Sequence, residues 1–325
     1  MIIRVSVPSR VHLTLIDLGF AGYRRNGGVG FSITEPRSTL AFKADPVVDL
    51  HALTSCGYPS AEIMRLTQRL VRLMKQRQLT QGVRLVEVQL PKRHFGFGTG
   101  TAVALACVES LFLLNGLSES PEYLRAHCGR GGASGIGLSS YFSGGFIFDA
   151  GRQFNPASIV GSDATDEVDE PPLEMARLNM MDWPMGVLIP PGTSALSLEQ
   201  EQGFFSRQLP LPAADVYEIT YHALFGALVA VRSRNYDTFC ASINTLQLCA
   251  WKSAEIDLYG QAVRTCASHL ASIGCDAVAM SSIGPALIFW ARDFDSAFAT
   301  VARHYGPSAV FRTSPDNMGR ILSHD

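Results

Sequence analysis

The sequence predicts an α+β fold arranged as two domains. Apolar residues alternate as in strands in some segments and recur at helical spacing in others. The two kinds of segment do not follow the strict strand–helix order of a parallel sheet. The chain has 325 residues, which is enough for two separate cores. We place an N-terminal domain with a phosphate-binding glycine loop over residues 1–160 and a C-terminal domain over residues 161–325.

The first half begins with strands and then alternates between the two element types. Ile3, Val5 and Val7 share one face of a period-two pattern. Ser60 suits a helix N-cap, and apolar residues follow it at helical spacing as far as Met74. The same criteria predict strands over residues 30–33, 38–42, 86–90 and 145–149, and helices over residues 100–114 and 121–127.

The second half opens with an acidic segment, residues 161–172. We interpret it as a solvated linker, with a metal-binding carboxylate cluster as the alternative. Gly284-Pro285 then separates two alternating segments and indicates a hairpin-like pair. The expected elements are strands over residues 183–189, 277–281, 286–290 and 308–312, and helices over residues 214–232, 236–250, 258–273 and 294–304.

Composition and charge argue against several classes of protein. The formal net charge of −2, from 27 basic and 29 acidic residues, lacks the basic excess of nucleic-acid-binding proteins. The most apolar later stretch, residues 221–231, is too short to span a bilayer, and the N-terminus lacks the apolar core of a signal peptide. The seven cysteines are odd in number and include no C-x-x-C, which favours free thiols. We expect a cytoplasmic protein with neither nucleic-acid nor membrane partners.

A glycine-rich turn between an expected strand and an expected helix is the strongest local motif. It reads Gly96-Phe97-Gly98-Thr99-Gly100-Thr101. Glycines let a backbone approach an anion closely, and the free N–H groups and dipole of a helix start favour phosphate. The spacing matches neither the Walker loop nor the dinucleotide fingerprint. The alternative is a tight turn without a ligand, and we interpret the neighbouring Lys92 and Arg93 as surface charges.

These motifs resemble those of the GHMP kinase superfamily, and one branch in particular. The chain is similar to beta-ribofuranosylaminobenzene 5'-phosphate synthases over blocks that span almost its whole length in order. The matching blocks are Ser9-Arg10-Val11-His12, Asp17-Leu18, Asn26-Gly27-Gly28-Val29-Gly30, Gly98-Thr99-Gly100-Thr101, Gly129-Arg130-Gly131-Gly132-Ala133-Ser134-Gly135-Ile136-Gly137 and Ser281-Ser282-Ile283-Gly284-Pro285. The resemblance implies a GHMP-kinase-like two-domain fold.

The resemblance also implies an activity. Enzymes of this branch join phosphoribosyl pyrophosphate (PRPP) to an aromatic carboxylic acid through a C–C bond and release CO2 and pyrophosphate. Several GHMP kinases carry an aspartate where this chain has Gly137, which has no side chain to act as a base. An ATP-dependent small-molecule kinase therefore remains only as an alternative, and a non-catalytic ligand-binding protein is a further one.

Roles for individual residues follow from the resemblance. We assign PRPP and phosphate binding to Gly96, Gly98, Thr99, Gly100, Thr101, Arg130, Ser134 and Gly135. We assign acceptor binding to Arg10, Arg24, Arg25, Asn26, Ser281 and Ser282. His12 and Asp17 are the catalytic candidates, and Asp17 is the expected protein ligand of a Mg2+ ion on the pyrophosphate. Purely structural roles remain open for His12, Asp17, the Arg24-Arg25 pair and the Ser281-Ser282 pair.

Departures from the family pattern bear on the acceptor. Asn26 replaces a usual aspartate, residues 13–15 replace a glycine-containing stretch, and Phe97 replaces a smaller residue. We interpret them as favouring a pyrazole dicarboxylate, the acceptor of related enzymes of C-nucleoside antibiotic biosynthesis. The alternative acceptor is 4-aminobenzoate or 4-hydroxybenzoate, as in methanopterin biosynthesis. A homodimer is expected from the resemblance alone.

Overall fold

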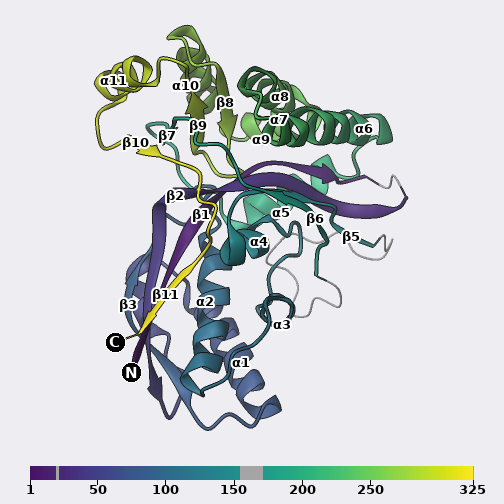
Figure 1. The fold of residues 1–325 in the computed structure, drawn as a ribbon. Helices are drawn as coiled ribbons and strands as arrows, with labels where there is room; N and C mark the ends of the chain where they lie inside the picture. Colours follow the sequence, from purple (N-terminus) through teal and green to yellow (C-terminus); the bar gives the residue numbers. More distant parts are fainter. Residues whose placement is uncertain (20–21, 154–170, 325) are drawn as a thin grey trace.

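The computed structural model describes residues 1–19, 22–153 and 171–324, and these residues form two antiparallel sheets flanked by helices (Figure 1). The larger sheet has the strand order β11-β1-β2-β4-β6, with β3 and β5 also paired to β2. The smaller sheet has the order β10-β7-β9-β8. The α+β prediction is therefore confirmed, whereas the predicted boundary at residues 160 and 161 lies outside the described residues.

A long hairpin organises the larger sheet. Strand β1 (Ile2–Asp17) pairs with β2 (Arg24–Asp45) from Ile2 opposite Lys43 to Asp17 opposite Asn26. The register shifts between Val7 and Ser9 and again between His12 and Thr14. The sequence predicted two short strands in this region, over residues 30–33 and 38–42. The structure has one continuous strand there, because β2 pairs with β1 on both sides of the register shift between Val7 and Ser9.

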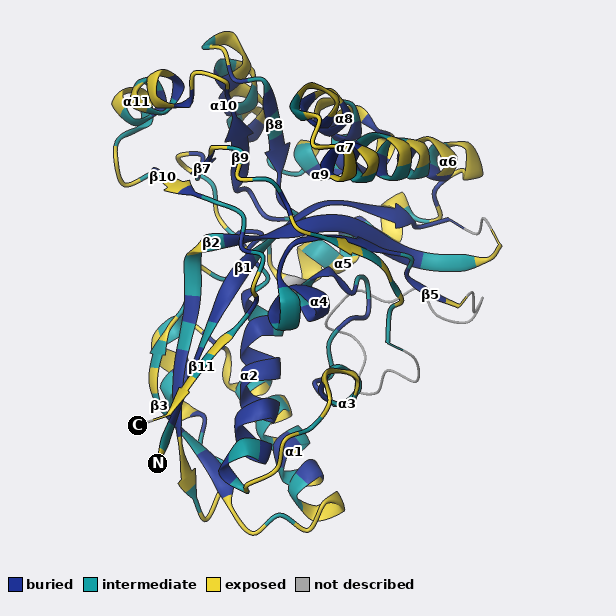
Figure 2. Ribbon diagram, in the orientation of Figure 1, coloured by how far each residue is buried: buried dark blue, intermediate teal, exposed yellow. Residues whose placement is uncertain are grey.

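The remaining elements of the first half cover this sheet. They are a 3-10 helix η1 (His51–Cys56), helices α1 (Ser60–Gln76), α2 (Thr99–Leu114), α3 (Pro121–His127) and α4 (Ile136–Ser143), and strands β3 (Gly82–Gln89), β4 (Phe146–Asp149) and β5 (Arg152–Gln153). Helix α2 is apolar on nearly every side and is buried along most of its length, as Figure 2 shows by its dark colour. Helix α4 was missed because glycines dominate residues 129–137 just before it.

The second half forms the smaller sheet and its helices. These elements are strands β6 (Glu174–Leu178), β7 (Met185–Leu188), β8 (Ala277–Met280), β9 (Leu287–Trp290), β10 (Val310–Thr313) and β11 (Ile321–His324), and helices α5 (Leu198–Gln208), α6 (Ala213–Tyr221), the π-helix η2 (His222–Leu228), α7 (Val229–Ser233), α8 (Tyr236–Leu248), α9 (Ala250–Asp257), α10 (Gly260–Ser272) and α11 (Phe294–Tyr305). Strands β6 and β11 return to the larger sheet, beside β4 and β1 respectively.

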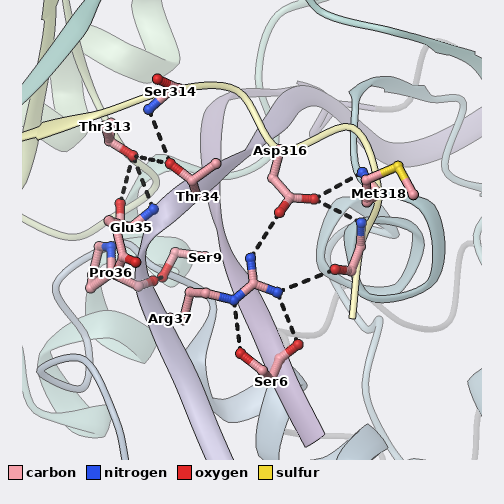
Figure 3. A network of polar contacts seen from close by, with 11 residues as sticks. Ser6, Ser9, Thr34, Glu35, Pro36, Arg37, Thr313, Ser314, Asp316 and Met318 are labelled. Carbon is pink, nitrogen blue, oxygen red and sulfur yellow. Dashed lines mark hydrogen bonds and ion pairs between the residues drawn. The ribbon is translucent and has the colours of Figure 1, made fainter. Parts of the chain in front are cut away.

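The C-terminal segment is attached to the hairpin by a buried polar network (Figure 3). Arg37 donates to Asp316 Oδ2 at 2.8 Å and to the Ser6 hydroxyl at 2.8 Å. The other carboxylate oxygen of Asp316 accepts from the backbone N–H of Gly319 at 2.7 Å. The Ser9 hydroxyl, part of the N-terminal motif, donates to the Pro36 carbonyl at 2.5 Å, so it serves the fold.

Two further predictions about composition can be compared with the structure. All seven cysteines are free, as predicted. Among the described residues, no helix is both long and apolar enough to cross a bilayer.

Candidate functional site

A cavity of about 100 Å³ lies where the glycine loop meets the smaller sheet. The loop residues 96–101 form one wall, and Ser282, Ile283 and Gly284 from the turn between β8 and β9 form another. Arg10 of β1 and Arg130 also line it. The structure thus brings together the predicted loop, one predicted acceptor arginine and one predicted serine.

Two glycines of the loop are required by close approaches. A Cβ atom at Gly96, whose φ is 96°, would lie 2.3 Å from the Ser281 carbonyl oxygen. A Cβ at Gly98, which has φ 74° and precedes the first turn of α2, would lie 2.6 Å from Arg10 Cγ. A side chain at either position would push the loop away from the residues that complete the cavity.

The Thr99 hydroxyl is a notable feature of the cavity wall. Thr99 is only 4% exposed, and its Oγ1 atom has no hydrogen-bond partner. A buried hydroxyl without a partner carries a free-energy penalty of roughly 1–3 kcal/mol. A ligand oxygen at the start of α2 would remove this penalty.

Positive charge surrounds the same cavity. Arg10 Nη1 donates to the Gly96 carbonyl at 3.1 Å, and Arg130 Nε donates to Thr101 Oγ1 at 3.4 Å. Burial, together with the neighbouring positive charge of Arg130, lowers the pKa of Arg10 to about 10. Two guanidinium groups held close together beside a helix N-terminus repel each other unless an anion lies between them. The arrangement suits a phosphate or diphosphate group.

Arg93 corrects one sequence interpretation. It is not a surface charge, because its side chain is 14% exposed, donates to Glu62 at 2.5 Å and lies 3.8 Å over the Tyr58 ring. Arg93 and Glu62 both line the cavity, so the loop is fixed to α1 by an ion pair.

His12 connects the N-terminal motif with the late serine motif. Its backbone N–H donates to Ser281 Oγ at 3.1 Å, and Ser281 Oγ donates to the Gly96 carbonyl at 2.7 Å. The Ser282 N–H donates back to the His12 carbonyl at 2.7 Å. Ser281 therefore links the backbones of His12 and Gly96, whereas Ser282 lines the cavity itself.

The His12 ring is buried and neutral. Burial, followed by the nearby charges of Arg10 and Lys252, holds the pKa of His12 well below its usual range. Its Nε2 atom lies 3.2 Å from Ser134 Oγ. A Cβ at Gly28 would lie 2.6 Å from this nitrogen, which explains the glycine in the facing strand.

Asp149 is a buried carboxylate that sequence reasoning missed. It ends β4, and its two oxygens accept from the backbone N–H groups of Gly135 and Gly151, the latter at 2.8 Å. Burial raises the pKa of Asp149 to about 6, although the bonds from Gly135, Gly151 and Ser134 oppose that shift. Asp149, Ser134 and His12 thus form a continuous chain of polar groups, in which Asp149 and His12 are buried and Ser134 is partly buried.

Most of the other predicted residues near the hairpin end form hydrogen bonds with backbone groups. Asp17 Oδ1 accepts from the Gly19 N–H at 3.1 Å, and Asn26 Nδ2 donates to the Gly132 carbonyl at 2.8 Å. Arg24 donates to the carbonyls of Ala150 and Gly151, both at 2.7 Å. Arg25 lies beside them, in register with Arg152 of β5. These contacts connect the hairpin end with the segment around Asp149.

Lys252 of α9 is a second functional candidate that the sequence did not reveal. Its side chain is fully buried, and Nζ donates to Glu255 Oε2 at 2.6 Å and to the Ser282 carbonyl at 3.0 Å. Trp251 Nε1 donates to the other oxygen of Glu255 at 2.9 Å. The backbone of Ser282 has φ 57°, a left-handed conformation that the lysine helps to hold.

Comparison with known proteins places the chain in a family. No protein-family model matches it. The beta-ribofuranosylphenol 5'-phosphate synthase of Archaeoglobus fulgidus is 30% identical over 283 residues, covering 87% of this chain and 86% of the relative. The enzyme of the same name from Methanothermobacter thermautotrophicus is 27% identical over 98% of both chains. The chain belongs to the beta-ribofuranosylphenol 5'-phosphate synthase family.

Solved structures give the same fold for this family member. A putative homoserine kinase from Listeria monocytogenes matches with a TM-score of 0.64 at 14% identity, over 99% of this chain and 100% of that one. A mevalonate 5-diphosphate decarboxylase matches with a TM-score of 0.62 at 12% identity, over 100% and 97% of the two chains. The GHMP-kinase-like fold predicted from the sequence is confirmed.

Gly137 has no side chain at the position where several GHMP kinases carry an aspartate. At Gly137 an added Cβ would already lie 3.3 Å from the Thr101 side chain, which itself lines the phosphate cavity. A longer acidic side chain at this position would require Thr101 to move. The loop geometry and the missing aspartate are therefore consistent with each other.

Proposed function

We propose that this chain is a PRPP-dependent C-ribosyltransferase with a hydroxybenzoate-type acceptor. C1 of ribose 5-phosphate forms a bond to the ring carbon that carries the carboxylate, as the C1–O bond to pyrophosphate breaks. The ring carbon then loses CO2, and the electron pair of the broken bond restores aromaticity. With the acid ionised, the reaction needs no net proton transfer.

The observation that supports the proposal most strongly is the positively charged cavity at the glycine loop, residues 96–101. It occurs in a chain that belongs to the beta-ribofuranosylphenol 5'-phosphate synthase family. Pyrophosphate leaves with several negative charges, so donors fixed toward it stabilise the transition state more than the ground state. The start of α2, the Thr99 hydroxyl and the guanidinium groups of Arg10 and Arg130 supply such donors. They need little reorganisation because the fold already holds them.

The neutral state of His12 fits the other half of the reaction. The ribose passes through a state with positive charge at C1, and a protonated His12 would add to the positive charge that Arg10 and Lys252 already supply. The lowered pKa of His12 keeps its ring uncharged, and Ser134 orients that ring. His12 would therefore act as a neutral hydrogen-bonding group and would not supply charge.

The comparisons favour the phenol-type acceptor over a pyrazole dicarboxylate. All three curated relatives carry the name beta-ribofuranosylphenol 5'-phosphate synthase, and two of them align over 87% of this chain. Loss of CO2 from a 4-hydroxybenzoate adduct gives such a phenol. Among the residues predicted for the acceptor, Arg10 and Ser282 line the cavity, while Arg24 is bound to backbone carbonyls.

We also propose that Mg2+ accompanies the pyrophosphate. When bound, it would neutralise part of the charge on the leaving group, and Mg2+ commonly takes a single protein carboxylate while keeping waters. Glu62 and Glu201 line the phosphate cavity, and Glu62 is paired with Arg93. We propose Glu201 as the ligand in place of Asp17, because Glu201 lines the cavity whereas the Asp17 carboxylate accepts from the turn at the hairpin end.

A product assay tests this function. The protein is incubated with PRPP, Mg2+ and either 4-hydroxybenzoate, 4-aminobenzoate or a pyrazole dicarboxylate, while CO2, pyrophosphate and the coupled product are quantified by mass spectrometry. We expect equal release of CO2 and pyrophosphate with 4-hydroxybenzoate. Release only with the pyrazole would restore the antibiotic-type acceptor. ADP formation from ATP and a small alcohol, with no release from PRPP, would instead support a kinase.

A further inference from the structure

A second cavity lies directly beside the glycine loop, between α1 and α2. Its volume is about 90 Å³, and it shares Glu62, Gly100 and Arg130 with the first cavity. Arg65 and Arg69 of α1 line it together with Arg130. No sequence motif pointed to these two arginines, since they look like ordinary polar positions on an amphipathic helix.

We propose that this second cavity binds the 5-phosphate of the sugar phosphate while the glycine loop binds its diphosphate. The inference rests on the proposed function, because it assigns the two anionic ends of one donor to two adjoining sites. The ribose ring would then lie at Gly100, the loop residue that both cavities share.

Charge supports an anionic occupant. Three guanidinium groups line the second cavity against one carboxylate, Glu62, which is already paired with Arg93 at 2.5 Å. Guanidinium groups donate in pairs to phosphate oxygens, so three of them at one site favour a phosphate group over a neutral base. The volume also suits a phosphate, since it is several times the space that one water needs.

Glycines bring two of the arginines close to the backbone. A Cβ at Gly129 would lie 2.1 Å from Arg69 Cζ, so the guanidinium lies directly over this glycine. A Cβ at Gly100 would lie 3.2 Å from Arg130 Nη2. Gly129 and Arg130 belong to the glycine-rich block that the sequence singled out, and this packing gives the block a role beyond Ser134 and Gly135.

The spacing of the two cavities suits the proposed donor. Gly100 lines both cavities, and Ala104, which lines only the second, follows one turn later on α2. One turn advances about 6 Å along a helix axis. A furanose ring with its 5-methylene group separates two phosphate groups by a comparable span. Arg130 lies between the sites and would contact both ends of the donor.

Calorimetric titrations with separate halves of the donor test the assignment. Ribose 5-phosphate and inorganic pyrophosphate are each titrated, with Mg2+ present, into the wild type, an Arg65→Gln/Arg69→Gln variant and a Thr99→Val variant. We expect the double variant to bind ribose 5-phosphate at least tenfold more weakly and pyrophosphate within twofold of the wild type. Thr99→Val should show the opposite pattern. Retained pyrophosphate binding also shows that the double variant is folded.

Arg72→Gln is the control, because it removes a charge from the same helix at a residue that does not line the cavity. It should leave both affinities unchanged. An unchanged affinity of the double variant for ribose 5-phosphate, or an equal loss for both ligands, would overturn the assignment. ATP is titrated as well, and a double variant that loses affinity for ATP but not for ribose 5-phosphate would assign the cavity to a nucleotide base and overturn the proposal. Failure of the wild type to bind PRPP would contradict the proposed function. The ribose 5-phosphate titrations would still show whether the second cavity binds a sugar phosphate.

Discussion

At the residue scale, the site contains groups whose ionisation differs from that in water. Asp149 is the clearest case, because the pKa of its carboxyl is raised to about 6 from 3.8. The carboxyl is 1% exposed, so burial outweighs the backbone N–H groups that favour the ionised form. His12 departs in the other direction, because burial and the nearby charges of Arg10 and Lys252 disfavour its protonated form.

We predict that Asp149 makes the stability of the folded protein depend on pH between about 4 and 6. Because the folded pKa is raised, the native state binds more protons than the unfolded state in this window. The wild type should therefore lose stability relative to Asp149→Asn as the pH rises from 4 to 6, by at most about 3 kcal/mol. Urea unfolding of both proteins at pH 4, 5, 6 and 7 measures this difference, and the comparison cancels the other titrating groups. A difference that is constant with pH, or that changes in the opposite direction, would contradict the raised pKa.

At the element scale, the sequence predicted the segments that carry a local signal. Alternation revealed β1, β3, β4, β8 and β9, and helical spacing revealed α1, α2, α8, α10 and α11. Strand β11 was missed because its four residues are stabilised by their pairing with β1, some 300 residues earlier in the chain. The segment that carries β11 is positioned by Arg37 and Asp316, whose pairing has no local sequence pattern.

We predict that Arg37→Ala destabilises the protein by about 3 kcal/mol, since it leaves a buried carboxylate without its partner. The Arg37 and Asp316 side chains are 17% and 8% exposed. The matched control is Arg312→Ala, which breaks an ion pair with Asp295 whose side chains are 52% and 85% exposed. The control should change the free energy of unfolding by less than about 1 kcal/mol. Equal losses for the two variants, measured by chemical denaturation, would show that burial does not decide the contribution.

At the scale of the whole molecule, the site is assembled from parts that are distant in sequence. Motif spacing located the glycine loop, His12 and the Ser281-Ser282 turn, because glycines and their flanking polar residues stand out locally. It could not locate Lys252 or Arg65, which occupy ordinary helical positions and meet their site neighbours only through tertiary packing. The same limit explains why Arg24 was assigned to a ligand, since its bonds to Ala150 and Gly151 arise from the folding of the hairpin end against the segment after β4.

The buried Lys252–Glu255 pair provides a test of how the C-terminal helices act on the phosphate cavity. Replacing Lys252 alone with Met would leave Glu255 buried and unpaired, and should destabilise the protein by roughly 3–5 kcal/mol. Replacing both residues with Met removes that penalty but leaves Trp251 Nε1 without its acceptor, so the double variant should recover part of the stability. It still lacks the donor that holds the Ser282 carbonyl, so Ser282 should be less well ordered at the cavity wall.

The double variant should therefore bind pyrophosphate several-fold more weakly than the wild type while unfolding at a higher denaturant concentration than Lys252→Met. Calorimetric titration and urea unfolding of the same preparations measure the two properties separately. Recovery of both stability and affinity would mean that Lys252 only fills space beneath the turn. Recovery of stability alone would make it a positioning residue, through which α9 sets the geometry of the turn that carries Ser282 to the cavity wall.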